Sequence, residues 1–376
     1  MNQETHRKLI SGRSTGLAAG LLRCLLRMAA VGYAMAVGVR NFLFSRGWLK
    51  AHRVDAAVIS IGNITTGGTG KTPLAVWLCE RITPNCKSQI SNLKSQISDF
   101  QCAILTRGYK AGKDPQLKTE DYSDEVAIFA QSCPAVKVIV NPDRVAGAAQ
   151  AIAKFGANVL IMDDGFQHRR LARDLDIVAV DATEPFGYGK LLPAGLLREP
   201  VASLKRAHAV VITRCDQAPK AELDVLEKKL LAMNPNLVVA RSIHRAVGAR
   251  SADGMEISLE QLKGRKVFAF CGIGNPKAFL SSIGNLGAEL AGSKVYDDHY
   301  HYTERCLDEI RAQAEASGAD IILTTQKDWT KVSGLAGRGK GVPLAYLTIE
   351  IKFLAGQDRL TSLIEKTLAD RISQSG

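Results

Sequence analysis

The sequence predicts an α/β protein of the P-loop NTPase type, in which a parallel sheet carries helices on both faces. Short apolar runs rich in β-branched residues alternate with helix-like stretches, as they do where parallel strands are joined by crossover helices. The first of these runs ends in a glycine-rich loop followed by Lys-Thr. With 376 residues, of which 46% are hydrophobic, the chain is long enough for about two domains, each with its own core.

Residues 1–53 carry most of the positive charge. They hold nine Lys or Arg and a single acid, which makes +8 of the net charge of +12. Arg23 and Arg27 interrupt an apolar stretch at residues 17–39. Its longest uncharged run, residues 28–39, spans about 18 Å as a helix against a hydrocarbon core of roughly 30 Å, and no signal-peptide cleavage site follows. We therefore expect a helix that lies in the membrane interface and does not cross the bilayer.

On a helical wheel this apolar stretch has two unlike faces. Leu21, Leu25, Met28, Met35 and Val39 lie opposite Gly16, Gly20, Arg23, Arg27, Ala30, Ala34, Gly38 and Asn41. The arginines would meet anionic headgroups while the bulky face enters the acyl boundary. Packing of the helix on the protein's own core is the alternative. Nucleic-acid binding is not favoured, because no basic stripe interleaved with aromatic residues accompanies the charge.

The glycine-rich loop covers residues 62–73 and precedes a helix predicted over residues 74–81. Only glycines let consecutive backbone N–H groups turn toward one anion, and the dipole of the following helix adds positive potential. In such a loop Lys71 reaches the terminal phosphates and the Thr72 hydroxyl ligates Mg²⁺. One departure is that Thr65 stands where G-x-x-x-x-G-K-[ST] has its first glycine. The predicted nucleotide-binding residues are Thr65, Thr66, Gly67, Gly68, Thr69, Gly70, Lys71 and Thr72.

Nine further apolar runs predict the remaining strands. They are residues 103–106, 136–140, 159–162, 177–181, 209–213, 237–241, 267–271, 320–325 and 344–349. A change of composition around residues 244–264 marks the expected domain boundary. We therefore expect a basic amphipathic membrane-associating segment over 1–50, a P-loop core domain over 51–245 and a smaller α/β domain over 246–376. A seven-residue segment at 87–93, nearly repeated at 94–100, is interpreted as a surface insertion without catalytic role.

A second group of chemical residues follows the run at 159–162, where the chain reads Asp163-Asp-Gly-Phe-Gln-His-Arg-Arg170. P-loop enzymes hold their magnesium at the carboxyl end of a neighbouring strand. One carboxylate can hold a metal-bound water while the other orients it, whereas two adjacent unpaired acids would repel each other. Asp-Asp-Gly is also an ordinary turn sequence, but the P-loop favours the metal site. The predicted magnesium ligands are Thr72, Asp163 and Asp164.

Four separated blocks resemble, in order, the tetraacyldisaccharide 4′-kinases, the lipid A 4′-kinases. The blocks are residues 62–73, 163–174, 191–200 and 324–328, and the resemblance runs from the basic N-terminal segment to about residue 350. In that family Thr or Ser stands at the position of Thr65, so this departure is a family trait. Two departures remain. They are Gln326, where Glu is usual, and the doubled seven-residue segment.

The resemblance implies transfer of the ATP γ-phosphate to the 4′-hydroxyl of a tetraacylated glucosamine disaccharide 1-phosphate, the lipid A precursor. It places the enzyme at the cytoplasmic face of the bacterial inner membrane as a peripheral or monotopic protein, with ATP and Mg²⁺ as cofactors. The partners expected are the lipid substrate and an anionic membrane surface, with no nucleic acid and no obligate protein partner.

A sugar hydroxyl is a poor nucleophile, so a positioned base should take its proton during phosphoryl transfer. The family places an Asp–His pair there, and the matching positions are Asp124 and His299, with His301 as the alternative partner. These two are the predicted catalytic residues, and we expect them to meet across the cleft between the domains. Glu125 is the further candidate for holding magnesium.

Other residues are candidates for phosphate or substrate contacts, because Arg forks match phosphate geometry. They are Arg107, Arg169, Arg170, Arg198 and His168, the last of which has a structural role as its alternative.

Two other functions fit the P-loop alone. The sequence Thr-Arg-Cys-Asp at 213–216 faintly resembles a guanine-specifying motif but lacks its lysine, which favours ATP. A membrane-binding switch or partition-type ATPase would need no second α/β unit. A metal-insertion GTPase would call for His- and Cys-rich segments, and the eight cysteines show no metal spacing.

Overall fold

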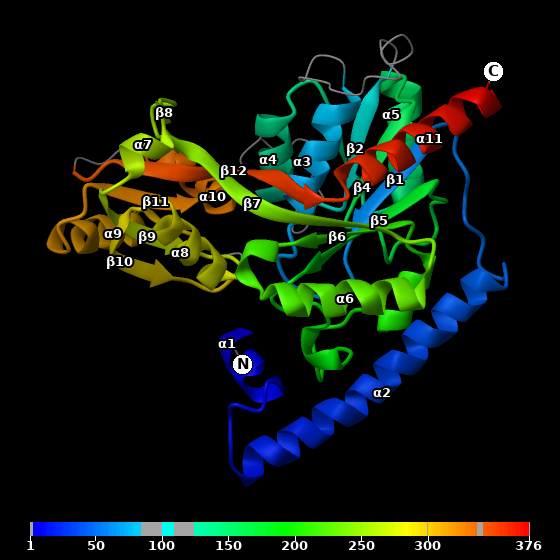
Figure 1. Ribbon diagram of the computed structural model, residues 1–376, viewed down its shortest axis with the longest axis horizontal. Helices are drawn as coiled ribbons and strands as arrows, with labels where there is room; N and C mark the ends of the chain where they lie inside the picture. Colours follow the sequence, from blue (N-terminus) through cyan, green and yellow to red (C-terminus); the bar gives the residue numbers. More distant parts are fainter. Residues whose placement is uncertain (1–2, 84–99, 109–123, 299, 337–340, 376) are drawn as a thin grey trace. The chain divides into compact units, whose positions relative to one another are not determined.

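The computed structural model describes residues 3–83, 100–108, 124–298, 300–336 and 341–375. The chain forms two compact units (Figure 1). The large unit comprises Thr5–Ile243 and Ile351–Gly376, and the small unit comprises Met1–Glu4 and His244–Glu350. The doubled segment at 87–100 lies, apart from its last residue, outside the described residues.

The large unit is built on a parallel sheet. Its strand order is β7-β6-β5-β1-β4-β2-β3, and each neighbouring pair is parallel. The strands are β1 (Ala57–Gly62), β2 (Cys102–Thr106), β3 (Lys137–Val140), β4 (Val159–Asp163), β5 (Leu175–Asp181), β6 (Ala209–Thr213) and β7 (Val238–Ser251). The P-loop strand β1 lies between β4 and β5, so the loops at the carboxyl ends of β1 and β4 are neighbours.

Helices cover both faces of this sheet (Figure 1). Successive side chains of a strand point to opposite faces, and Ile59 and Val58 accordingly belong to different cores. One face carries α3, α4 and α11, and the other carries α5 and α6. The helices are α3 (Lys71–Ile82), α4 (Asp124–Ser132), α5 (Arg144–Phe155), α6 (Lys220–Met233) and α11 (Gln357–Ser375). The predicted fold class is therefore confirmed.

Residues 351–376, which the sequence analysis placed with the smaller domain, belong to the large unit. Helix α11 buries Leu360, Ile364 and Leu368 in the same apolar core as Leu74 and Leu78 of the P-loop helix. Strand β12 (Leu344–Ala355) thus passes from one unit to the other. A sequence pattern identifies a helix but not the partner of its apolar face, so this return was not predictable.

The small unit repeats the architecture on a smaller scale. Its strands run in the order β10-β9-β11-β12, all parallel, and a short strand β8 (Glu256–Ile257) pairs antiparallel with the end of β7. Helix α8 packs on one face, and α9 and α10 pack on the other. The elements are α7 (Leu259–Leu262), β9 (Lys266–Cys271), α8 (Pro276–Asn285), β10 (Glu289–Val295), α9 (Glu304–Ala316), β11 (Ile321–Thr325) and α10 (Gln326–Ala336). Strand β10 was not predicted, because its sequence has no apolar run.

Two helices precede β1, namely α1 (Gln3–Ile10) and α2 (Leu17–Ser45). Helix α2 is longer than the stretch of 17–39 from which we reasoned, and its 29 residues span about 44 Å. By length and mean hydropathy it is the one helix among the described residues that could cross a membrane. The short uncharged run at 28–39 therefore does not by itself exclude a span.

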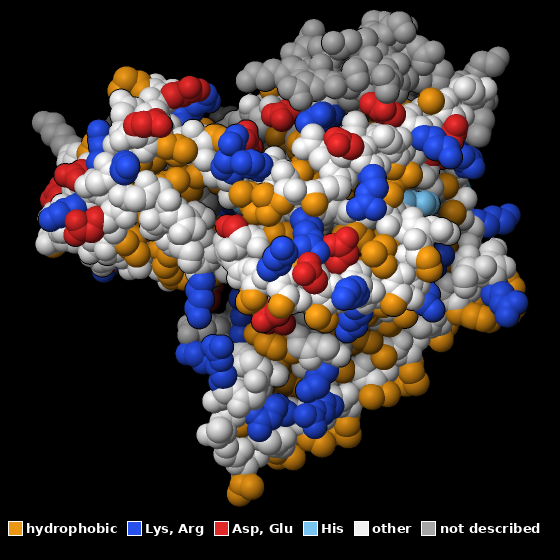
Figure 2. Space-filling view, viewed as in Figure 1, with side chains coloured by type: hydrophobic (Ala, Val, Ile, Leu, Met, Phe, Trp, Pro, Cys, Tyr) orange, Lys and Arg blue, Asp and Glu red, His pale blue; other side chains and the backbone are white. Residues whose placement is uncertain are grey.

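The two faces of α2 differ as the helical wheel predicted. Bulky apolar side chains are exposed along one face, with Leu21 at 67% and Met35 at 63% of full exposure. Figure 2 shows hydrophobic side chains in a row along α2. On the opposite face Val37 is buried, and Tyr33 and Arg40 contact Arg198 and Glu199 in the remainder of the large unit.

Candidate active site

The P-loop joins β1 to α3 and is held from several sides. Gly70 lies in the left-handed region at φ 86°, where a side chain would be strained, and α3 begins at the next residue. The Asn63 amide donates to the Thr69 hydroxyl at 3.0 Å, and the Thr213 hydroxyl donates to the Thr69 carbonyl at 2.9 Å. Arg214 donates to the Gly68 carbonyl at 2.7 Å. The loop is therefore shaped for an anion before one binds.

The 191–200 segment, one of the four resemblance blocks, lies against the P-loop. The Thr66 amide donates to the Leu196 carbonyl and the Arg198 amide donates to the Ile64 carbonyl, both at 2.7 Å. Thr65 forms an isolated bridge with Leu197. Thr65 thus continues the main-chain pairing of the loop, a role for which a β-branched residue is suited and a flexible glycine is not.

Asp163 and Asp164 stand beside this loop at the carboxyl end of β4. Asp163 pairs in register with Ile61 of the P-loop strand, and Asp164 lies in the left-handed region at φ 50°. The Lys71 Nζ atom is 3.3 Å from Asp164 Oδ1, and the Arg198 Nη1 atom is 2.7 Å from Asp164 Oδ2. The sequence predicts that the acidic pair lies at the same site as the P-loop. In the structure Lys71 and Arg198 both contact Asp164.

The pKa values of the two adjacent carboxylates are shifted in opposite directions. Burial, with the charge of Asp164 added, raises the pKa of Asp163 to about 7. Burial also acts on Asp164, but Lys71 and Arg198 outweigh it and lower the pKa of Asp164 to about 2. Such a divided pair is typical of functional sites, because neighbouring acids do not both ionise without cations.

The donor set fits a magnesium ion. Among the described residues the buried Asp163 Oδ1 atom has no hydrogen-bond partner, which a cation would supply. No three His, Cys, Asp or Glu side chains within the described ranges gather as a closed metal centre. Magnesium does not need one, because it takes one or two carboxylates, waters and substrate phosphates. The residues that would hold it are Thr72, Asp163 and Asp164.

Asp124 and Glu125 form the first turn of α4. The charge of Glu125 contributes to the raised pKa of Asp163, so the start of α4 faces the carboxylate pair. His299 lies outside the described residues, and its pairing with Asp124 stays a prediction. His301 belongs to the small unit and is exposed there.

The candidate arginines fall into different roles. Arg198 is part of the site, whereas Arg170 is exposed and lies 3.4 Å from Asp143. Arg169 donates to the Asn41 carbonyl at 2.9 Å and lies over the Phe44 ring, so it holds α2. The charge of Arg107 lowers the pKa of Arg144, which places Arg107 near the site.

His168 and Arg144 lie close together beside the carboxylates. Burial and the charge of Arg144 lower the pKa of His168, which favours the neutral form of its ring. Arg144 is buried, and its guanidinium donates to the Asn141 carbonyl at 2.7 Å. Burial lowers the pKa of Arg144 to about 10 despite the opposing charge of Asp163. Sequence reasoning missed Arg144, because a helix-starting arginine is ordinary and only tertiary packing brings it to Asp163.

The segment 213–216 buttresses the loop. Arg214 lies in the left-handed region at φ 55°, pairs with Asp181 and donates to the P-loop carbonyl of Gly68. A guanine-reading role is thus replaced by a structural one. This arrangement agrees with the preference for ATP drawn from the missing lysine.

A family model described as Tetraacyldisaccharide-1-P 4'-kinase matches residues 22–369. The chain belongs to this family. A Tetraacyldisaccharide 4'-kinase of Anaeromyxobacter sp. (strain Fw109-5) is 35% identical over 97% of both chains. A relative of the same name from Geobacter sulfurreducens is 33% identical over 88% of this chain and 90% of its own length. The resemblance that the four sequence blocks carried is therefore confirmed.

A solved structure gives the same result for the fold. The crystal structure of LpxK from Aquifex aeolicus, described as an apo form in complex with ATP, superimposes with a TM-score of 0.70 and 28% identity. The match covers 92% of this chain and 99% of that one. The 4'-kinase family thus matches this chain in sequence and in three-dimensional structure.

Proposed function

We infer that this protein is a tetraacyldisaccharide 4'-kinase, which transfers the γ-phosphate of ATP to the 4'-hydroxyl of a tetraacylated glucosamine disaccharide 1-phosphate. The observation that carries this function is a P-loop whose Lys71 lies 3.3 Å from Asp164, within a chain that matches the family over residues 22–369. A partition-type or switch ATPase would not account for that match.

The chemistry follows from the charges at the site. The backbone amides of the loop and the N-terminus of α3 face the phosphates, and Lys71 neutralises the charge that grows on them during transfer. Thr72, Asp163 and Asp164, with Glu125 near, would hold a magnesium ion, which would supply positive charge to offset that of the phosphates. Arg198 stands on the other oxygen of Asp164 and keeps that carboxylate ionised.

Deprotonation of the 4'-hydroxyl is assigned to Asp124 and His299. Asp124 lies at the N-terminus of α4, one residue before Glu125, whose charge reaches Asp163. In our proposal the carboxylate raises the basicity of the imidazole, which then accepts the hydroxyl proton as the phosphoryl group moves.

A single assay tests the function. Purified protein with γ-labelled ATP, Mg²⁺ and micellar tetraacyldisaccharide 1-phosphate should give a labelled lipid, and release of labelled phosphate without the lipid should be far slower. A matched acceptor that already carries a 4'-phosphate should remain unlabelled. ATP hydrolysis at the same rate with and without the acceptor would contradict a kinase and support a simple ATPase.

We further propose that α2 holds the enzyme on the cytoplasmic face of the inner membrane by lying in the interface. The substrate is a lipid, and the exposed row of Leu21, Leu25, Met28, Met35 and Val39 presents an apolar face. Arg27 of the same helix is exposed and could meet anionic headgroups. The 29-residue length of α2 makes a spanning helix the alternative that an experiment must separate.

The interfacial arrangement predicts a distinct extraction pattern. The protein should sediment with anionic phospholipid vesicles, and 1 M salt should release only part of it, because salt screens charge but leaves apolar burial. Alkaline carbonate should release the remainder. Met28→Ser with Met35→Ser should lower vesicle binding. Complete release by salt alone would contradict apolar insertion, and resistance to carbonate would indicate a span.

A further inference from the structure

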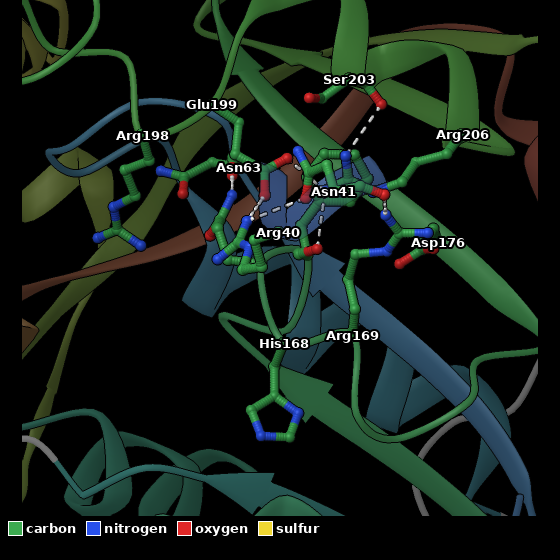
Figure 3. A network of polar contacts seen from close by, with 12 residues as sticks. Arg40, Asn41, Asn63, His168, Arg169, Asp176, Arg198, Glu199, Ser203 and Arg206 are labelled. Atoms are coloured by element: carbon green, nitrogen blue, oxygen red, sulfur yellow. Dashed lines mark hydrogen bonds and ion pairs between the residues drawn. The ribbon is translucent and has the colours of Figure 1, made fainter. Parts of the chain in front are cut away.

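The protein-facing side of α2 contacts one dipeptide of the 191–200 segment, Arg198-Glu199. The Tyr33 hydroxyl donates to the Arg198 carbonyl at 2.9 Å. About two helical turns further on, the Arg40 guanidinium pairs with Glu199 Oε1. Figure 3 shows Arg40 and Glu199 within a continuous polar network that includes Arg198 and Arg206. These contacts are separate from the exposed apolar row of the same helix.

Glu199 depends on these arginines. Its side chain is completely buried, and its other oxygen lies 2.6 Å from the Arg206 Nη2 atom. Arg206 in turn stacks 3.7 Å over the Phe166 ring and donates to the Phe166 carbonyl. A buried carboxylate that loses one of two cationic partners keeps an uncompensated charge, so its surroundings must rearrange. Arg40 therefore fixes Glu199 from the α2 side, as Arg206 does from the core.

Arg198 carries the other half of the connection. Its amide donates to the Ile64 carbonyl at the start of the P-loop, and its guanidinium donates to Asp164 Oδ2 at 2.7 Å. The residue is thus held by α2 at its carbonyl and by the nucleotide site at its amide and side chain. Two hydrogen bonds, through Arg198, therefore connect the Tyr33 hydroxyl to Asp164, the carboxylate that we assign to magnesium.

We propose that Tyr33 and Arg40 are positioning residues for phosphoryl transfer, which act by fixing Arg198 and Glu199 and thereby the guanidinium that holds Asp164. Helix α2 is then a structural support of the catalytic site as well as a membrane-binding element. The inference rests on the proposed function for its choice of acceptor. Its physical reason is that a charge misplaced by about 1 Å at a phosphoryl-transfer site is costly.

The decisive variants change the contact and leave the exposed face untouched. Tyr33→Phe removes one hydroxyl, Arg40→Gln removes the charge, and Arg40→Lys restores the charge without the fork. We expect Arg40→Gln to lower kcat about tenfold and Tyr33→Phe somewhat less, with partial recovery in Arg40→Lys. KM for ATP and binding to anionic vesicles should stay within about twofold of the wild type, since neither residue belongs to the P-loop or to the exposed apolar row.

Gly32→Ala is the matched control. It lies next to Tyr33 on an exposed part of α2, and a Cβ there meets no atom within 4 Å. Its kcat should equal that of the wild type. The proposal is overturned if both Tyr33→Phe and Arg40→Gln keep kcat within twofold of the wild type. It is also overturned if their loss of kcat parallels a loss of vesicle binding, because α2 would then act only as an anchor.

The rate of ATP hydrolysis without acceptor distinguishes failure of this inference from failure of the proposed function. If the wild type hydrolyses ATP without phosphorylating the lipid, the function falls. The inference is then decided by whether Arg40→Gln lowers the hydrolysis rate, as expected, or leaves it unchanged. Thermal unfolding monitored by circular dichroism establishes that each variant is folded. Should Arg40→Gln not fold, Tyr33→Phe decides the matter, because loss of one hydroxyl leaves the Glu199 pair intact.

Discussion

Lys71→Ala is expected to lower phosphoryl transfer by about a hundred- to a thousandfold while the protein stays folded. In our proposal the Lys71 ammonium neutralises β- and γ-phosphate charge, and that charge grows in the transition state. The fold should survive because Asp164 keeps its contact with Arg198 at 2.7 Å. The measurements are kcat with the lipid acceptor, and thermal unfolding of the purified variant.

A matched control is Lys154→Ala, which removes an exposed lysine near the end of α5 in the same unit. It should leave kcat unchanged, so that loss of one positive charge is separated from loss of the phosphate contact. Turnover by Lys71→Ala close to that of the wild type would show that the nucleotide site is assigned wrongly. If a decrease in thermal stability accounts for the lost activity, the proposed role of Lys71 in phosphoryl transfer would be wrong.

Asp124→Ala and His299→Ala should each lower kcat strongly, by about a hundred- to ten-thousandfold, with modest change in ATP affinity. General-base catalysis contributes at the transition state, so binding of nucleotide should be nearly unaffected. If the two side chains act as a unit, the double variant should be little worse than either single one. The readouts are single-turnover rates and the affinity for a nonhydrolysable ATP analogue.

The control for this pair is His301→Ala, two residues from His299 and the alternative partner of Asp124. It should retain most of its turnover if His299 is the base. If the fold decrease in kcat of the Asp124 and His299 double variant equals the product of the two single decreases, the two residues do not act as a dyad. A greater loss in His301→Ala than in His299→Ala would transfer the role to His301.

The residues that could be predicted are those whose chemical role is recognisable from their neighbours in the sequence. The P-loop glycines and Lys71 are neighbours in the sequence, and so are Asp163 and Asp164. Each of these two groups follows an apolar strand. Carboxyl ends of parallel strands meet at one edge, so the fold class places both groups at the same edge of the sheet. The strand order, in which β1 pairs with β4, makes them neighbours. The same reasoning could not reach Arg144, because nothing local separates it from any helix-starting arginine.

Helix α2 shows the same division. Its two faces could be read from the spacing of Leu, Met and small residues, since a helix has 3.6 residues per turn. The continuation to Ser45 was missed, because reasoning ended at the last bulky residue before Arg40. That Arg40 is directed inward to a buried acid instead of outward to headgroups depends on Glu199, which lies 159 positions away in sequence.

By itself, the sequence determined the α/β class, the phosphate-binding loop, the acidic pair at the end of β4 and the membership of the 4'-kinase family. Each of these depends on residues close together in the chain, where backbone geometry and periodicity act directly. Only the tertiary structure decided that α11 completes the core of the large unit, that Arg214 supports the P-loop, and that Tyr33 and Arg40 reach Arg198-Glu199. These are contacts between segments that are distant in sequence. Many residues could form such contacts equally well, and only the packing of the folded chain decides which of them are buried together.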